Sequence, residues 1–175
     1  MKKYELTSET KIVFGHILYR IKALSSFGYV SAGDLGGFLE SEKNLSQNGN
    51  AWVSGNARVY GNAEVSGNAE VYGSARVSGN AEVYGNARVS GNAEVSKIGS
   101  IFWIGAVGSR NDTATFFRCT DGVVRVTCGC FFGNLDEFAK KVRKTHGDND
   151  HAKVYMLAID MAKIRISTEK EKTEE

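Results

Sequence analysis

The sequence lacks the features that mark membrane and nucleic-acid-binding proteins. Its 175 residues contain no apolar run of roughly 18 residues, the length that a membrane-spanning helix needs. The formal net charge is only +2, and basic residues occur in short runs instead of the clusters that phosphate backbones attract. We therefore expect no membrane span and no general nucleic-acid binding.

The beginning of the chain lacks the pattern of a secretory signal. Residues 1–7 include two lysines, but neither an apolar core nor a small-residue cleavage site follows them. We expect a cytoplasmic protein.

Cysteine is scarce, and its count is odd. Of the three cysteines, Cys128 and Cys130 flank a single glycine in a stretch that is typical of a strand. Side chains two residues apart on a strand point to the same face without good disulfide geometry. Reduced thiols are therefore the expectation.

The sequence does contain a six-residue repeat over residues 44–96, built on the phrase Val-Ser-Gly-Asn-Ala-Glu. A valine recurs at every sixth position from Val53 to Val95, and an alanine lies two residues before each. A helix would spread residues six apart around its axis, whereas a strand keeps them on one face because six is a multiple of two. The Gly-Asn pair in most phrases tolerates the positive φ of a corner. The repeat therefore predicts short strands, joined by corners, that coil into a solenoid.

Each six-residue unit consists of an aliphatic residue, three variable residues, a small residue and one more variable residue. This order resembles the hexapeptide repeat of left-handed parallel β-helices. The resemblance covers about a third of the chain. In that family three hexapeptides form one coil, so the repeat implies about three coils of about eighteen residues. Leu45 falls outside the valine register, which is consistent with an opening coil.

Side chains eighteen residues apart stack on adjacent coils in this scheme. Glu70 then lies beside Arg88 as a favourable pair, whereas Arg58 and Arg76 are like-charged neighbours.

Aromatic side chains also occupy outward positions of the repeat. Together with the flat coil faces they favour a homodimer or homotrimer, since hexapeptide relatives often form trimers. These aromatic residues are Trp52, Tyr60, Tyr72 and Tyr84.

Acyltransferases and metal-dependent carbonic anhydrases are enzymes of the hexapeptide family, and both carry a histidine on the coils. This chain has no histidine in residues 44–96. We therefore expect neither reaction on the solenoid, and no cofactor.

Residues 1–43 precede the repeat and predict an N-terminal β cap. Residues 11–24 are typical of a hairpin that turns near Gly15, and glycine-rich residues around Gly36 lead into the repeat. A cap would cover the first coil, whose open end would otherwise template aggregation.

The repeat period ends at Lys97, and residues 98–166 predict a small α+β domain behind the mainly β solenoid of residues 44–97. Strand-like runs joined by Asp121-Gly122 indicate a three-stranded antiparallel sheet. Asn134 with Glu137 forms a capping box for a helix that should end at Gly147, and a second helix is expected over residues 150–165. Both helices would pack on one face of the sheet, and residues 167–175 form a charged tail.

A polar loop over residues 108–113 separates two apolar strands. Its guanidinium, hydroxyl and backbone N–H groups suit phosphate or carboxylate, although an ordinary surface turn is the alternative. Because recognition needs groups that do not repeat, we place a ligand or partner site in this domain. The candidate site residues are Ser109, Arg110, Asn111, Asp112, Thr113, Cys128, Cys130 and His146.

Three parts of the chain resemble uncharacterised hexapeptide-repeat proteins of phages and prophages of gut Firmicutes. They are the segment of residues 18–46, the loop at residues 108–113 and the Cys-Gly-Cys motif at residues 128–130. This resemblance implies a viral accessory protein in the cytoplasm of a host cell. The expected function is non-catalytic binding, as a counter-defence inhibitor that holds a host immune protein or sequesters a small anionic signalling nucleotide.

The alternative is chemistry at the thiols. Cys128 or Cys130 with His146 would make a Cys/His-dependent enzyme, and the same groups with His151 would make a zinc site. Cys-Gly-Cys is tighter than the usual zinc-ligand spacing, and the two histidines fall on different elements.

Overall fold

The computed structural model describes residues 2–166, and the chain forms two compact units, one up to Ile98 and one from Gly99 onward. The predicted charged tail of residues 167–175 lies outside the described residues. In the described part of the chain, no helix combines the length and the apolar character that crossing a bilayer requires.

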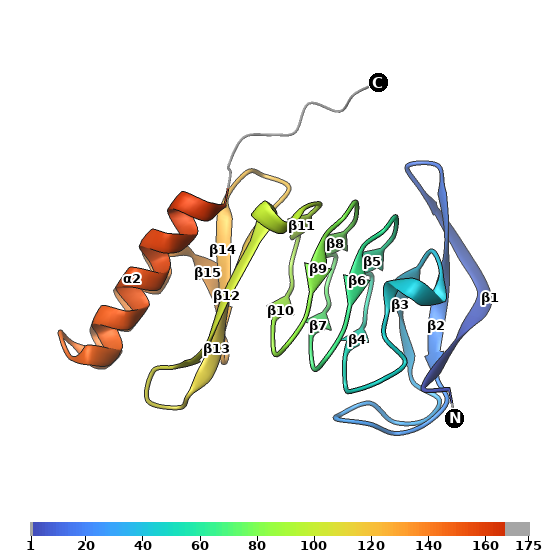
Figure 1. Cartoon of the computed structure of the whole chain (residues 1–175), viewed down its shortest axis with the longest axis horizontal. Coiled ribbons are helices and arrows are strands. Elements are labelled where there is room, and N and C mark those ends of the chain that lie inside the picture. The colour runs from blue at the N-terminus through green and yellow to red at the C-terminus, as the bar shows by residue number, and fades with distance from the viewer. Residues whose placement is uncertain (1, 167–175) are drawn as a thin grey trace. The chain divides into compact units, whose positions relative to one another are not determined.

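The repeat folds as a solenoid of about three coils, as predicted. Each phrase contributes a two-residue strand that ends at a valine, and strands one coil apart pair in parallel (Figure 1). Three ladders result, in the orders β4-β7-β10, β5-β8-β11 and β6-β9. The strands are Trp52–Val53 (β4), Arg58–Val59 (β5), Glu64–Val65 (β6), Glu70–Val71 (β7), Arg76–Val77 (β8), Glu82–Val83 (β9), Arg88–Val89 (β10) and Glu94–Val95 (β11).

The interior of the solenoid is the stack of valines and alanines that the repeat predicts. All eight strand valines are fully buried, and the alanines two residues before them are at most 1% exposed. Burying each valine contributes roughly 1.5–3 kcal/mol to stability. The valines and alanines that recur every six residues therefore form the core of the solenoid.

The corners depend on glycine and asparagine. Gly61 has φ 68°, and a Cβ there would lie 3.2 Å from the backbone nitrogen of Gly79 one coil away. At a neighbouring corner the side-chain amide of Asn50 donates to Asn68, and that of Asn68 donates to Asn86, each over 3.1 Å. Only glycine fits the close approach, and the amide ladder joins successive coils.

The outward charges stack as predicted. Arg88 pairs with Glu70 of the adjacent coil, with 3.3 Å between the Arg88 Nε and the Glu70 Oε1. Arg58 and Arg76 lie side by side as like charges.

The N-terminal hairpin is present and is longer than predicted. Strands β1 (Tyr4–Val13) and β2 (His16–Ala23) are antiparallel, and β2 pairs with β3 (Leu35–Leu39). Because β3 pairs in parallel with β5, the hairpin extends one ladder of the solenoid into a six-stranded sheet, β1-β2-β3-β5-β8-β11 (Figure 1).

The start of β1 caps the first coil. In the ladders each N–H donates to a carbonyl of the next coil, as from Trp52 to Ala69 over 3.0 Å, so first-coil carbonyls have no preceding coil to bond. The Lys3 ammonium donates to the Ala51 carbonyl (2.9 Å) and the Tyr4 hydroxyl to the Leu45 carbonyl (2.7 Å). These side chains supply the missing donors, which confirms the predicted cap.

The first coil is longer than the others, which explains the register of Leu45. Leu45 is fully buried and bridges to Val65, twenty residues on, whereas later coils repeat every eighteen. A single 3-10 turn, η1 (Glu42–Asn44), precedes it. The side-chain amide of Asn44 donates to the Gly61 and Ala63 carbonyls, at 3.1 and 2.8 Å, where the longer coil leaves them without backbone donors.

Two of the outward aromatic residues are not solvated, contrary to expectation. Trp52 and Tyr60 are 7% and 8% exposed because the N-terminal segment covers them. Phe27 packs edge-on against Trp52, and His16 packs against Tyr60. Tyr84 stays open, at 49% exposed, and Tyr72 is partly exposed.

The second unit is a four-stranded antiparallel sheet with two helices, which confirms the predicted α+β class with one strand more than expected. A 3-10 turn, η2 (Ile98–Ser100), leads into the unit. The strand order β12-β13-β14-β15 follows the chain. The elements are β12 (Ile101–Val107), β13 (Asp112–Arg118), β14 (Val124–Cys128), β15 (Phe131–Asn134), α1 (Leu135–His146) and α2 (Asp150–Arg165).

The additional strand arises from a tight turn at the Cys-Gly-Cys motif. Gly129 has φ 56°, and Cys128 pairs with Phe131 across the turn. Cys130 therefore lies in the turn and is exposed, and the prediction that both cysteines share one strand face is wrong. Cys119, Cys128 and Cys130 are free cysteines, and Cys119 is buried.

Both helices begin and end where the sequence predicts. Asn134 accepts from the Glu137 N–H over 2.9 Å and the Glu137 carboxylate accepts from the Asn134 N–H, while Gly147 ends α1. Buried residues of both helices join the core on one face of the sheet, where Phe138 packs edge-on against Phe116 and Tyr155.

The buried cap lysine gives the first unit a distinctive pH dependence. Burial lowers the pKa of Lys3 to about 8, so between about pH 8 and 10.5 the unfolded chain binds more protons than the folded chain, and stability rises with pH. Across this window the unfolding free energy of the wild type should rise by about 2 kcal/mol more than that of Lys3→Met. Urea unfolding at both ends of the window measures this gain.

The exposed Lys22 provides the control, since Lys22→Met should keep the pH profile of the wild type. Identical profiles for wild type and Lys3→Met would show that Lys3 is not desolvated by the cap.

Candidate functional site

Five of the eight candidate site residues line one pocket of about 230 Å³ in the second unit. They are Ser109, Arg110, Asp112, Cys128 and His146, and the pocket is completed by Gly129, Thr145 and Tyr155. The residues come from two turns of the sheet, the end of α1 and the middle of α2. The pocket is therefore a product of tertiary packing.

The sheet brings the two turns together. Antiparallel pairing of β12, β13 and β14 sets the β12–β13 turn and the β14–β15 turn at the same end of the sheet. A Cβ at Gly129 would lie 3.2 Å from the Asp112 carboxylate and 3.6 Å from the Arg110 guanidinium. The missing side chain at Gly129 thus leaves room between these charged groups and Cys128.

Tyr155 reaches the pocket from α2 although it is only 6% exposed. Its hydroxyl donates to the Val107 carbonyl over 3.4 Å, and lies 3.7 Å from the Cys128 sulfur. Its ring stacks on His146, with 5.9 Å between centroids. Burial, with the Cys128 contact as a second cause, raises the pKa of Tyr155 above its ordinary value. Tyr155 therefore remains a neutral hydrogen-bonding group at physiological pH.

The pocket combines a guanidinium, an imidazole and hydroxyl groups with one carboxylate. Arg110, His146 and the hydroxyls of Ser109 and Thr145 can all donate to an anion. One oxygen of Asp112 accepts from the Thr113 N–H over 2.8 Å, so the backbone already stabilises part of its charge. This donor set suits a phosphate or carboxylate group.

The other three candidate residues do not line the pocket. Asn111 occupies a left-handed position (φ 52°) in the β12–β13 turn, and its N–H bonds to the Gly108 carbonyl over 3.3 Å. Thr113 is 9% exposed within β13, and Cys130 is exposed in the β14–β15 turn.

Sequence reasoning missed Gly129, Thr145 and Tyr155 as pocket residues. Tyr155 lies on the apolar inner face of α2, but its hydroxyl reaches past the core to the pocket rim. The sequence signal for this role is the hydroxyl of Tyr155, a polar group on an otherwise apolar helix face.

The described residues contain no group of three or more histidine, cysteine, aspartate or glutamate side chains placed to hold a metal ion. His146 and His151 do lie close, with ring centroids 5.6 Å apart, although they belong to different helices.

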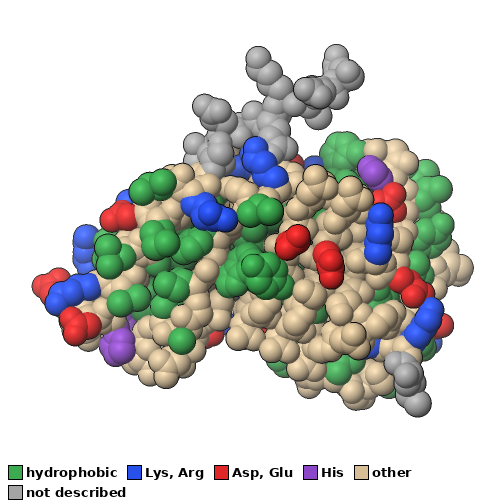
Figure 2. Space-filling model, viewed as in Figure 1, with side chains coloured by type: hydrophobic (Ala, Val, Ile, Leu, Met, Phe, Trp, Pro, Cys, Tyr) green, Lys and Arg blue, Asp and Glu red, His purple; other side chains and the backbone are tan. Residues whose placement is uncertain are grey.

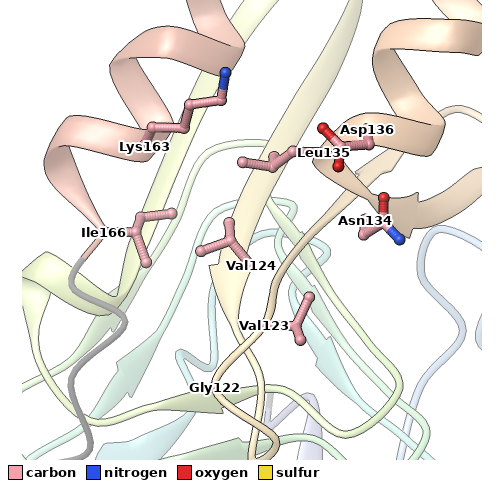
Figure 3. Close-up of a pocket in the computed structure, with 8 residues that line it drawn as sticks. All are labelled: Gly122, Val123, Val124, Asn134, Leu135, Asp136, Lys163 and Ile166. Carbon is pink, nitrogen blue, oxygen red and sulfur yellow. The ribbon is translucent and has the colours of Figure 1, made fainter.

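Two further hollows lie outside the candidate site. One of about 290 Å³ lies between the start of α1 and the end of α2, where Val124, Leu135 and Ile166 converge and Asp136 and Lys163 stand at the edge (Figure 3). The other, of about 180 Å³, is on the solenoid and is lined by Tyr29, Trp52, Ser54, Glu70 and Tyr72. Neither includes a candidate site residue.

Comparison with known proteins identifies the repeat. The model of the YdcK beta solenoid repeat family matches residues 51–67, 75–91 and 81–96, all within the coils described above. The repeat region is thus similar to a β-solenoid family, in agreement with its structure. No curated protein matches the chain significantly. The resemblance to phage proteins stays a prediction.

Gly108 lies directly against the Tyr155 side chain that reaches the pocket. Gly108 and Gly147 both have positive φ (70° and 59°), but a Cβ at Gly108 would overlap the Tyr155 hydroxyl, whereas a Cβ at Gly147 would meet nothing within 4 Å. Both alanine substitutions carry a backbone cost, and Gly108→Ala should lose about 1 kcal/mol or more beyond Gly147→Ala through overpacking. Thermal and urea unfolding of the two variants measure the difference. Equal losses would mean that Tyr155 does not pack against Gly108.

Proposed function

We propose that this chain is a non-catalytic binding protein whose second unit receives an anionic group in the pocket around Arg110. The observation that carries the proposal is the convergence of Arg110, His146, Ser109 and Thr145 on one pocket from two separate parts of the unit, the β12–β13 turn and the end of α1. Charge-assisted hydrogen bonds from a guanidinium to phosphate or carboxylate are about twice as strong as neutral ones.

The size of the pocket limits the ligand. Sites that enclose drug-sized molecules measure roughly 300–1,000 Å³. A pocket of about 230 Å³ accommodates one phosphate- or carboxylate-sized group, while the remainder of the ligand lies on the surface. The anion would thus be part of a larger molecule, either a signalling nucleotide or an acidic side chain of a protein.

The phage-type resemblance supports a biological setting for this binding. A counter-defence inhibitor that holds a host immune protein, or sequesters an anionic nucleotide in the host cytoplasm, needs recognition without turnover. In this proposal the solenoid is a scaffold, since its coils repeat one phrase and offer few unique groups. The histidine on which coil-based enzymes of the hexapeptide family depend is missing from residues 44–96.

Arg110 should dominate anion binding. Arg110→Ala should weaken the binding of pyrophosphate by about 1.5–3 kcal/mol, because a charge-assisted and bidentate contact is lost. Arg110→Lys should recover only part of this loss, since an ammonium cannot bind in the bidentate mode. Isothermal titration calorimetry measures both effects, and thermal melts should be unchanged because Arg110 is exposed.

Arg143 is the matched control, as an exposed arginine on α1 that does not line the pocket. Arg143→Ala should bind pyrophosphate like the wild type. The proposal fails if the wild type binds none of pyrophosphate, inorganic phosphate and phosphoserine peptides. It also fails if Arg110→Ala and Arg143→Ala lose affinity for pyrophosphate equally.

A second candidate function is Cys/His-dependent catalysis. The pocket favours Cys128 for this role, since Cys128 and His146 both line it and the thiol contacts the Tyr155 hydroxyl. Exposed Cys130 lies in the turn outside the pocket, so Cys128 is the thiol that lines it.

Cys128→Ser separates the two functions. If the pocket only binds, the variant should fold and bind pyrophosphate within about threefold of the wild type, because a hydroxyl replaces a thiol of similar shape. If the thiol is a nucleophile, hydrolysis of p-nitrophenyl acetate or p-nitrophenyl phosphate by the wild type should disappear in Cys128→Ser and persist in Cys130→Ser. Turnover with that pattern would replace binding by catalysis as the function.

A further inference from the structure

A carboxylate lies in the pocket that we propose for an anion. Asp112 lines this pocket together with Arg110, and charges of like sign repel at contact distances near a protein surface. A ligand that carried only an anionic group would therefore be repelled by Asp112. Figure 2 shows side chains of both charge signs, with a histidine, at the end of the second unit where α2 begins, close in sequence to the pocket residues Thr145 and His146. The presence of both charges in the pocket indicates a ligand that offers more than an anion.

Gly129 leaves a space that both charged groups border. A Cβ at Gly129 would lie 3.2 Å from the Asp112 Oδ2 and 3.6 Å from the Arg110 Nη2. The other carboxylate oxygen, Oδ1, accepts from the Thr113 N–H. Within residues 2–166, no ion pair includes Arg110 or Asp112. A small ligand group in this space, here called the Gly129 gap, would reach both charges.

Hydrogen-bond chemistry selects the group that fits the Gly129 gap. The guanidinium of Arg110 can only donate, and the ionised carboxylate of Asp112 can only accept. A phosphate oxygen in the gap would face the Asp112 charge, and an ammonium group would face the Arg110 charge. A hydroxyl accepts from the guanidinium and donates to the carboxylate, so it satisfies both neighbours.

Arg110 can bind this hydroxyl and the anion at the same time. Its guanidinium presents several N–H donors in one plane, so the nitrogens that do not face the Gly129 gap can donate to a phosphate oxygen. The hydroxyl and the phosphate must then be close together in the ligand. A phosphate ester with a hydroxyl on the neighbouring carbon meets this requirement.

We propose that the pocket binds a small ribonucleotide with a phosphate on the 2′ or 3′ oxygen of its ribose, and that the neighbouring ribose hydroxyl lies in the Gly129 gap. This inference rests on the proposed anion pocket and narrows its ligand. Of the two ligands considered above, a nucleotide carries a hydroxyl beside its phosphate, whereas an acidic protein side chain carries none. The phosphate would contact Arg110, His146 and the hydroxyls of Ser109 and Thr145, which line the pocket.

A matched pair of ligands tests the hydroxyl. Adenosine 3′-monophosphate and its 2′-deoxy form differ by the hydroxyl that the proposal places in the Gly129 gap. The wild type should bind the ribose form at least about fivefold more tightly, because the deoxy form leaves the Asp112 carboxylate desolvated and without a hydrogen-bond donor. Isothermal titration calorimetry measures both dissociation constants.

Asp112→Asn removes the charge and keeps the shape of the side chain. The asparagine oxygen can still accept from the Thr113 N–H, so the turn should be preserved. The preference for the ribose form should fall below about twofold, and pyrophosphate should bind several-fold more tightly because a like charge is gone. Asp160→Asn, at an exposed aspartate of α2 outside the pocket, is the control that should keep the wild-type preference.

Gly129→Ala tests the space itself. Gly129 and Gly147 both have positive φ (56° and 59°), so alanine carries a similar backbone cost at each position. A methyl group at Gly129 would fill the gap, whereas a Cβ at Gly147 would meet nothing within 4 Å. Gly129→Ala should abolish the preference for the ribose form and retain pyrophosphate binding, and Gly147→Ala should change neither.

Four results would overturn the inference. The first is a wild type that binds pyrophosphate but shows no preference for the ribose form, which would leave the anion pocket itself intact. The second is a preference that survives both Asp112→Asn and Gly129→Ala. The third is an RNA hexamer of adenosine that binds more than about tenfold more tightly than adenosine 3′-monophosphate, which would make single-stranded RNA the ligand instead of a small nucleotide. The fourth, a wild type that binds no anion, would overturn the proposed anion pocket as well.

Discussion

The first unit depends on one repeated interaction, the hydrogen bond from an N–H of one coil to a carbonyl of the next. This ladder fixes the eighteen-residue coil, places every valine inside and brings glycines at the corners into close approach. Backbone N–H groups in and directly after β3 donate to the Ala57 and Val59 carbonyls of the first coil, but other carbonyls of that coil lack a donor from a preceding coil, and an unpaired polar group away from water is costly. Lys3, Tyr4 and Asn44 supply the donors that a preceding coil would have given. The cap is therefore a consequence of the ladder.

Repetition limits what the solenoid can recognise. Stacked coils place equivalent groups beside one another, as the asparagine amides and the Arg58–Arg76 neighbours show. Such a surface is uniform along its length, whereas selective binding needs a particular set of donors at particular positions. The non-repeating second unit supplies that set around Arg110, which is why the two parts of the chain receive different roles in our proposal.

Helix α2 serves two purposes in the second unit. Its inner face packs on the sheet, and Tyr155 extends from that face to the edge of the pocket. Tyr155 connects the core with the pocket, because the same side chain packs on Phe138 and stacks on His146.

The sequence alone determined the features that depend on local periodicity and local hydrogen bonds. Alternation in steps of six predicted the coils and the lateral charge pairs, and the Asn134–Glu137 box with Gly147 predicted the limits of α1. Five residues that line the pocket were also candidates from the sequence, Ser109, Arg110 and Asp112 as a polar loop between apolar strands and Cys128 and His146 as non-repeating reactive groups. Long-range contacts decided the rest. The N-terminal segment covered Trp52 and Tyr60, the turn at Gly129 added β15, and helix packing brought Thr145 and Tyr155 to the pocket. These contacts join residues far apart in the chain, and no pattern within a short window of sequence encodes which distant side chain arrives.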